Sequence, residues 1–112
     1  MNIETMIDLV KIKAALPESR VRFRQHSALM MIERGISRDE VYNTILHGEI
    51  IEEYLTDKPF PSCLIFHFNN ERPVHVVCSY NDIDDFLIII TVYIPDLDHF
   101  KNDFRTRRSR DE

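Results

Sequence analysis

The second half of the chain consists of four apolar runs separated by turn sequences, and this pattern limits the possible fold more than any other feature. The runs are rich in the β-branched and aromatic residues that favour strands, and they span 49–55, 62–68, 74–80 and 86–94. The short polar stretches 69–71 and 81–85 are typical of hairpin loops, whereas 57–61 holds two prolines and predicts a stiffer connection. We therefore predict four antiparallel strands that follow one another in the sheet.

The first half of the chain has helical spacing instead. Apolar residues recur every three or four positions near the N-terminus, which predicts a helix within 1–17 that ends at Pro17. A short helix over 26–34 is expected to stop at Gly35, where a left-handed conformation costs glycine little. Ser37 and Glu40 form a capping-box sequence for a second helix, which Gly48 closes.

The segment 20–24 alternates arginine with valine and phenylalanine, so it predicts either a short half-buried strand or an extended lead-in to the helix. The expected fold class is α+β, with the N-terminal helices packed on one face of a four-stranded antiparallel sheet.

Alternation along the strands divides their side chains between two faces. The face expected to meet the helices carries Leu64, Phe66, Phe68, Val74, Val76, Cys78, Tyr80, Phe86, Ile88, Ile90, Val92 and Ile94. The other face carries Cys63, Ile65, His67, His75, Val77, Ser79, Leu87, Ile89, Thr91 and Tyr93. We expect His67, His75, Thr91 and Tyr93 to gather at one end of this second face.

Length and composition are those of an ordinary globular protein. The chain of 112 residues predicts a single domain, with a basic and flexible tail over 104–112. The longest apolar run is far too short for a membrane span, and the first residues do not resemble a secretion signal. Cys63 and Cys78 lie in strands without a CxxC spacing, so we expect buried thiols in a cytoplasmic protein.

Charge is distributed unevenly along the chain. The net charge is −5, yet ten of the 14 basic residues lie within 20–38 and 101–110. Between these segments, 39–99 holds twelve acidic residues against only Lys58 and Arg72. Such asymmetry indicates a basic binding surface on an acidic body, or a solvated tail together with an amphipathic strand.

The imidazoles and the phenol on the second face of the sheet can take and give protons near neutral pH, and His26 is a further candidate for acid–base chemistry. It opens a helix directly after Arg22 and Arg24, where free backbone N–H groups favour anions and disfavour a charged imidazole. The alternative is a half-buried histidine that is hydrogen-bonded to the sheet. No HxxxH or HExxH spacing and no glycine-rich phosphate loop occurs, so we expect neither a metal nor a small-molecule cofactor.

Several short motifs in order resemble a known family. They are 22–26 (RFRQH), 33–37 (ERGIS), 48–51 (GEII), 59–64 (PFPSCL), 75–77 (HVV) and 91–95 (TVYIP). Together they resemble the DUF4258 family, which is grouped with RelE/ParE-like toxins. The resemblance covers about 21–108 and implies a toxin-like core over 20–100. It also implies a type II toxin encoded beside an MqsA-like antitoxin, with RNA as the substrate. One departure is Met30, where relatives often carry arginine.

The resemblance and the strand pattern lead to a hypothesis of metal-independent RNA cleavage. RNA supplies its own 2′-hydroxyl nucleophile, so the enzyme needs a base, an acid and cations. His75 or His26 would be the base, Tyr93 the acid or an orienting group, and Thr91 a supporting hydrogen-bond partner. The expected substrate contacts are Arg24, Arg34, His67, Arg107 and Arg108.

Two other functions fit the same sequence. One is a non-catalytic module that keeps the toxin-like fold and binds a protein partner through its sheet face or its tail. The other is a ParE-like toxin that acts on a protein target without nuclease chemistry. Salt dependence separates RNA binding from an apolar protein interface, because only RNA binding releases many counterions.

Overall fold

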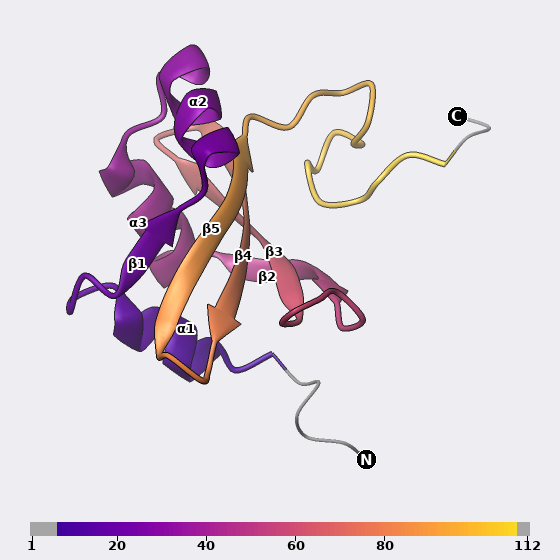
Figure 1. Ribbon diagram of the computed structural model, residues 1–112. Helices are drawn as coiled ribbons and strands as arrows, with labels where there is room; N and C mark the ends of the chain where they lie inside the picture. The colour runs from indigo at the N-terminus through magenta and orange to yellow at the C-terminus, as the bar shows by residue number, and fades with distance from the viewer. Residues whose placement is uncertain (1–6, 110–112) are drawn as a thin grey trace.

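Residues 7–109, which the computed structural model describes, form three helices and one five-stranded sheet (Figure 1). In chain order the elements are α1 (Leu9–Ala15), β1 (Val21–Phe23), α2 (Gln25–Arg34), α3 (Arg38–His47), β2 (Glu49–Tyr54), β3 (Ser62–Asn69), β4 (Arg72–Asn81) and β5 (Phe86–Tyr93). The α+β class is confirmed, and so are the four strands and the two helices predicted after residue 25. The predicted N-terminal helix is observed as α1, while residues 1–6 lie outside the described part.

The prediction of a four-stranded antiparallel sheet is wrong, because 20–24 adds a fifth strand. The strand order is β1-β5-β4-β3-β2, and β1 runs parallel to β5. The Leu87 N–H donates to the Arg20 carbonyl (2.8 Å), and the Arg24 N–H donates to the Ile89 carbonyl (3.0 Å). The sequence left this segment as a strand or a lead-in because its pairing partner lies more than sixty residues further along the chain.

The helix ends follow local chemistry. The Asp8 side chain accepts from the Lys11 N–H and caps α1. Ser37 and Glu40 form the expected capping box at α3. Gly35 ends α2 with φ at 63°, in the left-handed region. These ends were readable from sequence because each depends on residues within four positions.

The predicted division of side chains between the two faces is partly wrong, and the β3–β4 turn is one reason. Asn70 and Glu71 both have positive φ (51° and 70°), so the turn has two residues and pairs Asn69 with Arg72. This register places Ile65 opposite Val76, whereas the prediction grouped Val76 with Leu64 and Phe66. A change of one residue in register moves a whole strand to the other face.

A bulge in β5 is the other reason. The pairing runs Val77–Thr91 and then Cys78–Ile89, so the alternation shifts by one residue at Ile90. Leu87 and Ile89 therefore face the helices together with Val92. The helix-facing core contains Ile12, Ala15, Leu16, Ile36, Val41, Ile45, Cys63, Ile65, Val74, Val76, Cys78, Leu87, Ile89 and Val92.

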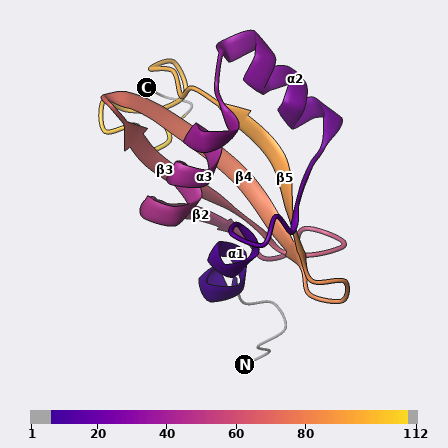
Figure 2. The same cartoon turned by 90° about the vertical axis from the view of Figure 1, so that its left-hand side faces the viewer.

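The two faces of the sheet are covered by different parts of the chain. Figure 2 shows α1 and α3 in front of the strands, while α2 lies toward the upper end of β5. The segment that follows β5 lies on the side of the sheet away from α1 and α3 (Figure 1), and its Phe100 and Phe104 contact His75 there. Cys63 and Cys78 are buried free thiols as expected, with their Sγ atoms 4.0 Å apart.

Candidate functional site

The second face of the sheet carries its side chains in cross-strand rows. The pairing registers of β2, β3, β4 and β5 define two neighbouring rows, Glu49–Phe66–His75–Tyr93 and Glu52–Leu64–Val77–Thr91. A bulge at Ile51 in β2 is what lets Glu49 and Glu52 share this face. His75, Tyr93 and Thr91 therefore lie together on one face, as the sequence predicted.

His75 is fully buried and both of its ring nitrogens are occupied. Nε2 lies 2.6 Å from the Phe104 carbonyl oxygen, which can only accept, so Nε2 carries the proton. The ring also packs edge-on against Phe100, with centroids 4.6 Å apart. Burial lowers the pKa of His75 to about 4, and the Phe104 carbonyl opposes this only in part. His75 is a neutral, shielded imidazole at physiological pH.

Tyr93 is held by His75. Its hydroxyl lies 3.2 Å from His75 Nδ1, and because Nδ1 carries no proton the hydroxyl donates. Burial raises the pKa of Tyr93 above its ordinary value, while the nearby charge of Arg107 lowers it. The phenol oxygen is thus held in place while its O–H bond can rotate, and it lies beside a guanidinium that would stabilise its ionised form.

His26 and Thr91 form the second pair. His26 lies in the first turn of α2, and its exposed ring places Nε2 at 3.1 Å from Thr91 Oγ1. The pairing of β1 with β5 fixes this position, since Arg24 is hydrogen-bonded to β5 and is the N-cap of α2. Thr91 and Tyr93 are two positions apart on one face of β5, so their Cβ atoms are about 7 Å apart. The four predicted catalytic residues therefore form two hydrogen-bonded pairs, His26–Thr91 and His75–Tyr93, and β5 contributes one residue to each pair.

Of the predicted substrate-binding arginines, Arg107 lies near Tyr93, where it is paired with Glu52, and the others do not gather there. Arg24 is exposed, two positions before His26. Arg34 lies at the opposite end of α2 from His26, about 12 Å along the helix axis. Arg107 is paired with Glu52 through two contacts of 3.1 and 3.2 Å, and Arg108 Nε donates to the Leu97 carbonyl (2.6 Å). Arg24 is exposed and is the nearest of these arginines to His26 along the chain.

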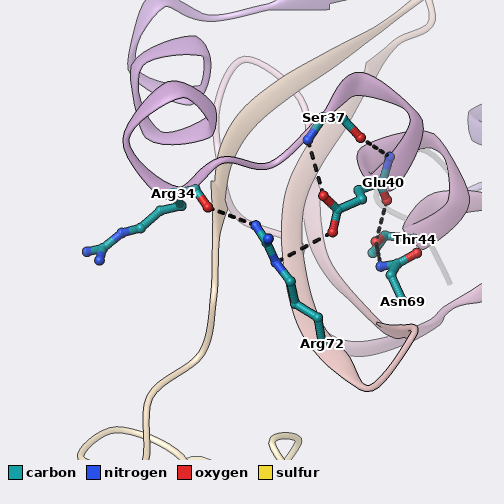
Figure 3. Close-up of polar contacts among 6 residues, drawn as sticks. All are labelled: Arg34, Ser37, Glu40, Thr44, Asn69 and Arg72. Carbon is teal, nitrogen blue, oxygen red and sulfur yellow. Dashed lines mark hydrogen bonds and ion pairs between the residues drawn. The ribbon is translucent and has the colours of Figure 1, made fainter.

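The surroundings of Arg34 have a structural role. Its carbonyl accepts from Arg72 Nη2 (2.9 Å), and Arg72 also lies 3.5 Å from Glu40 (Figure 3). Glu40 in turn belongs to the capping box with Ser37, while Thr44 accepts from Asn69. These contacts tie the α2–α3 junction to the β3–β4 hairpin, and the Arg34 side chain points away from them (Figure 3).

The prediction that His67 shares a face with His75 is wrong. The register pairs His67 with Val74, which places it on the helix side of the sheet. Its ring lies 6.0 Å from that of His47, between centroids, and the two histidines line a polar groove of about 320 Å³. Burial, with a smaller effect of His47, lowers the pKa of His67. Its role in substrate binding stays a prediction, at a place separate from His75.

A model of a domain of unknown function, DUF4258, matches residues 23–94, which is more than half of the chain. The chain belongs to the DUF4258 family. The match includes His26, His75, Thr91 and Tyr93 but ends before the segment that covers His75. No curated protein and no solved structure matches the chain significantly.

Four residues around the site of this DUF4258 member, Glu49, Glu52, Tyr54 and Arg105, were missed from sequence. Glu52 accepts from Arg107 and from the Tyr54 hydroxyl, and Glu49 is paired with Arg105. Burial alone would raise the pKa of Glu52, but the hydrogen bonds from Arg107 and Tyr54 lower it. The available signal was the acidic strand 49–54 together with the basic tail, which could have predicted their pairing.

Of the predicted tail over 104–112, residues 104–109 are described, and several of them bond to the sheet or to their own loop. Asp103 accepts from the backbone N–H groups of Arg105 and Thr106, and Phe100 pairs with Arg107 across a bridge. Residues 110–112 lie outside the described part, and flexibility of the tail stays a prediction.

Among residues 7–109, no cluster of three or more ligating side chains is placed to hold a metal ion. Within the same range, no helix has the length and apolar character needed to cross a membrane.

Proposed function

We propose that the protein is a toxin of a type II toxin–antitoxin pair that cleaves RNA without a metal, on a RelE/ParE-like fold. One observation carries the proposal most directly. The exposed His26 ring is held by Thr91 on the strand that also presents Tyr93, itself oriented by His75. A base held in one orientation and an oriented phenol on one face are what 2′-hydroxyl attack on the adjacent phosphate requires.

In the proposed mechanism, the His26–Thr91 pair supplies the base and the His75–Tyr93 pair supplies the acid. We assign His26 Nε2 as the donor to Thr91, which leaves Nδ1 free to take the proton of the 2′-hydroxyl. The 2′-oxygen then attacks phosphorus, the bond to the 5′-oxygen breaks, and a cyclic phosphate forms. Tyr93 turns its hydroxyl from His75 and donates the proton to the departing 5′-oxygen. Arg24 binds the phosphate, and the charge of Arg107 stabilises the phenolate until solvent returns to it the proton that His26 took from the 2′-hydroxyl.

This division changes the role of His75. A fully buried ring with both nitrogens bonded cannot reach a substrate, so His75 positions Tyr93 rather than acting as the base. Of the four arginines predicted to contact phosphate, Arg107 is bonded to Glu52 and Arg108 to the Leu97 carbonyl, so we assign the phosphate to exposed Arg24.

The test is cleavage of a labelled RNA by purified variants. His26→Ala should lower the cleavage rate by about 10² to 10⁴, the usual contribution of a positioned base. His99→Ala is the matched control, because His99 is also exposed but bonds only within its own loop, to Asp96. The His99 variant should cleave like the unmodified protein, and both should arrest growth in proportion to their cleavage. A His26→Ala protein that still cleaves and still arrests growth contradicts the proposal.

The proposed partners are RNA and a cognate MqsA-like antitoxin, and the proposed location is the cytoplasm. RNA binding should weaken steeply as salt is raised, because Arg24 and its neighbours release counterions from the phosphates. Co-expression of the neighbouring gene should suppress growth arrest if that gene encodes the antitoxin.

A non-catalytic protein-binding module is the second candidate, and one observation favours it. The C-terminal segment already occupies the sheet face over His75, so that part of the face is closed to substrate. This function, or a ParE-like action on a protein target, would be indicated by an absence of RNA cleavage with retained growth arrest. Incubation with gyrase would then separate a protein-directed toxin from a binding module.

A further inference from the structure

The outer edge of β1 is the first of three observations that concern one surface. β1 is the end strand of the sheet and pairs only with β5 among the described residues. The backbone groups of Arg20 and Arg24 bond to β5, so by alternation those of Val21 and Phe23 face outward. An unpaired edge of this kind is a ready template for a strand of another polypeptide.

An apolar groove lies directly beside this edge, on the helix side of the sheet. It has a volume of about 310 Å³ and is lined by Phe23, Ala28, Met31, Ile32, Ile36 and Arg38. Ile32 of α2 is 78% exposed, and Leu29 is 51% exposed. A strand added to β1 would direct every second side chain toward this side. The groove could therefore receive the apolar side chains of an added strand.

The charge around the edge and the groove is positive. From Arg20 to Arg38 the chain has five arginines and a single acidic residue, Glu33. Exposed Arg22 lies over the Phe86 ring (3.9 Å to its centroid), on the face opposite the groove, because β1 pairs it with Ile88. Arg38 lies over the Phe23 ring (5.5 Å) at the margin of the groove. An added strand would thus meet a cation on each side of the sheet.

We propose that the β1 edge and its groove bind an extended acidic segment of a partner protein. The segment pairs with the backbone of Val21 and Phe23, inserts apolar side chains beside Ile32, and directs carboxylates toward Arg22 and Arg38. This inference goes beyond the proposed function, because docking here requires no RNA cleavage and uses neither His26 nor Tyr93.

The probe is a synthetic peptide of about seven residues, the length of a typical strand, in which glutamate alternates with valine and leucine. Binding is followed by fluorescence anisotropy, and protection of the Val21 and Phe23 amides by hydrogen exchange. Two control peptides keep the length. One replaces glutamate with lysine, and the other carries N-methyl groups on the amides of one edge. The acidic peptide should bind and protect both amides, whereas both controls should bind at least about tenfold more weakly.

Two matched protein variants test the location of the site. Ile32→Asp places a charge in the groove and should weaken binding about tenfold or more. Val10→Asp is the control, since Val10 is equally exposed (78%) but lies on α1, and it should leave the affinity unchanged. Arg22→Glu and Arg38→Glu should each weaken binding of the acidic peptide, and circular dichroism checks that every variant folds.

Four outcomes would overturn the proposal. The acidic peptide could fail to bind, or Val10→Asp could weaken binding as much as Ile32→Asp. The N-methylated peptide could bind equally well, which would show charge attraction without strand pairing. If the unmodified protein sediments as a dimer and the Ile32→Asp variant as a monomer, a second copy of the chain occupies the edge. Cleavage by these variants is measured separately, so failure of docking leaves the ribonuclease proposal untouched.

Discussion

At the scale of single residues, His75 and His26 show how position decides the chemistry of one side-chain type. His75 is buried beneath Phe100 and held neutral by the loss of solvent, with its proton bound to the Phe104 carbonyl. His26 is exposed and bonds only to Thr91 in the described part of the chain. In the proposed mechanism, the same type of side chain would therefore position Tyr93 in one place and act as the base in the other.

The depressed pKa of His75 predicts a pH dependence of stability. The unfolded chain binds a proton near pH 6.5, whereas folded His75 binds one only near pH 4, so stability falls as pH drops through this window. The loss amounts to about 3 kcal/mol at most and is complete below pH 4. Urea denaturation at several pH values between 4 and 7 measures it.

His75→Gln is the variant for this measurement, because it keeps a donor for the Phe104 carbonyl but does not titrate. Its stability should change less between pH 7 and pH 4.5 than that of the unmodified protein. The difference between the two proteins also removes the smaller contribution of His67, which has the same sign. Equal slopes for both proteins would show that His75 is not the titrating group.

At the scale of elements, the two glycines end their helices for different reasons. Gly35 has φ at +63° with open space where a Cβ would lie. Glycine is therefore favoured there by the backbone conformation and not by a lack of space. Gly48 has an extended backbone, but a Cβ there would press against the carbonyl oxygens of Thr44 and Phe66. Gly48 therefore sets the close approach of α3 to β3.

The two glycine-to-alanine variants should differ in stability. Gly35→Ala should cost about 1 kcal/mol, from the left-handed conformation alone. Gly48→Ala should cost more, about 2 to 3 kcal/mol, because fixed backbone atoms cannot yield to the added methyl group. Urea denaturation of both variants gives the comparison. A cost for Gly48→Ala equal to or below that of Gly35→Ala would contradict the steric argument.

At the scale of the whole molecule, residues 96–108 cover the His75 end of the sheet face that the helices leave uncovered. Phe100 packs on His75, while Arg105 and Arg107 pair with the acidic strand β2. Part of the uneven charge along the chain is therefore paired within the molecule, because basic residues of the C-terminal segment bind acidic residues of β2. Arg22, Arg24 and Arg38 are left as exposed charges at the other edge of the sheet.

Removing the Phe100 ring should therefore change both the stability of the protein and the pKa of His75. Phe100→Ala should destabilise the protein by about 3 kcal/mol, as for other buried aromatic residues, and should raise the pKa of His75 toward 6.5 by admitting water. Leu97→Ala in the same segment is the control, since Leu97 is 49% exposed, and it should change neither. NMR titration of the His75 ring reports the pKa. An unchanged pKa in Phe100→Ala would mean that the segment does not shield the histidine.

The sequence by itself determined what depends on neighbours in the chain. It located four of the five strands, the capping box at Ser37, the glycine stop at Gly35, and the presence of His75, Thr91 and Tyr93 on one face. Alternation along a strand fixed the Thr91–Tyr93 relation, and hydrogen bonds within four residues fixed the helix ends.

Only the tertiary structure decided what depends on pairing between distant segments. The two-residue turn at Asn70 and the bulge at Ile90 set the registers, and these moved His67 away from His75 and brought Ile89 to the helices. The pairing of β1 with β5 brought His26 to Thr91, and the return of the C-terminal segment buried His75. Neither a one-residue shift of strand register nor a contact between segments some sixty residues apart changes the hydrophobic periodicity of the sequence. The energy of both comes from surfaces that meet only in the folded chain.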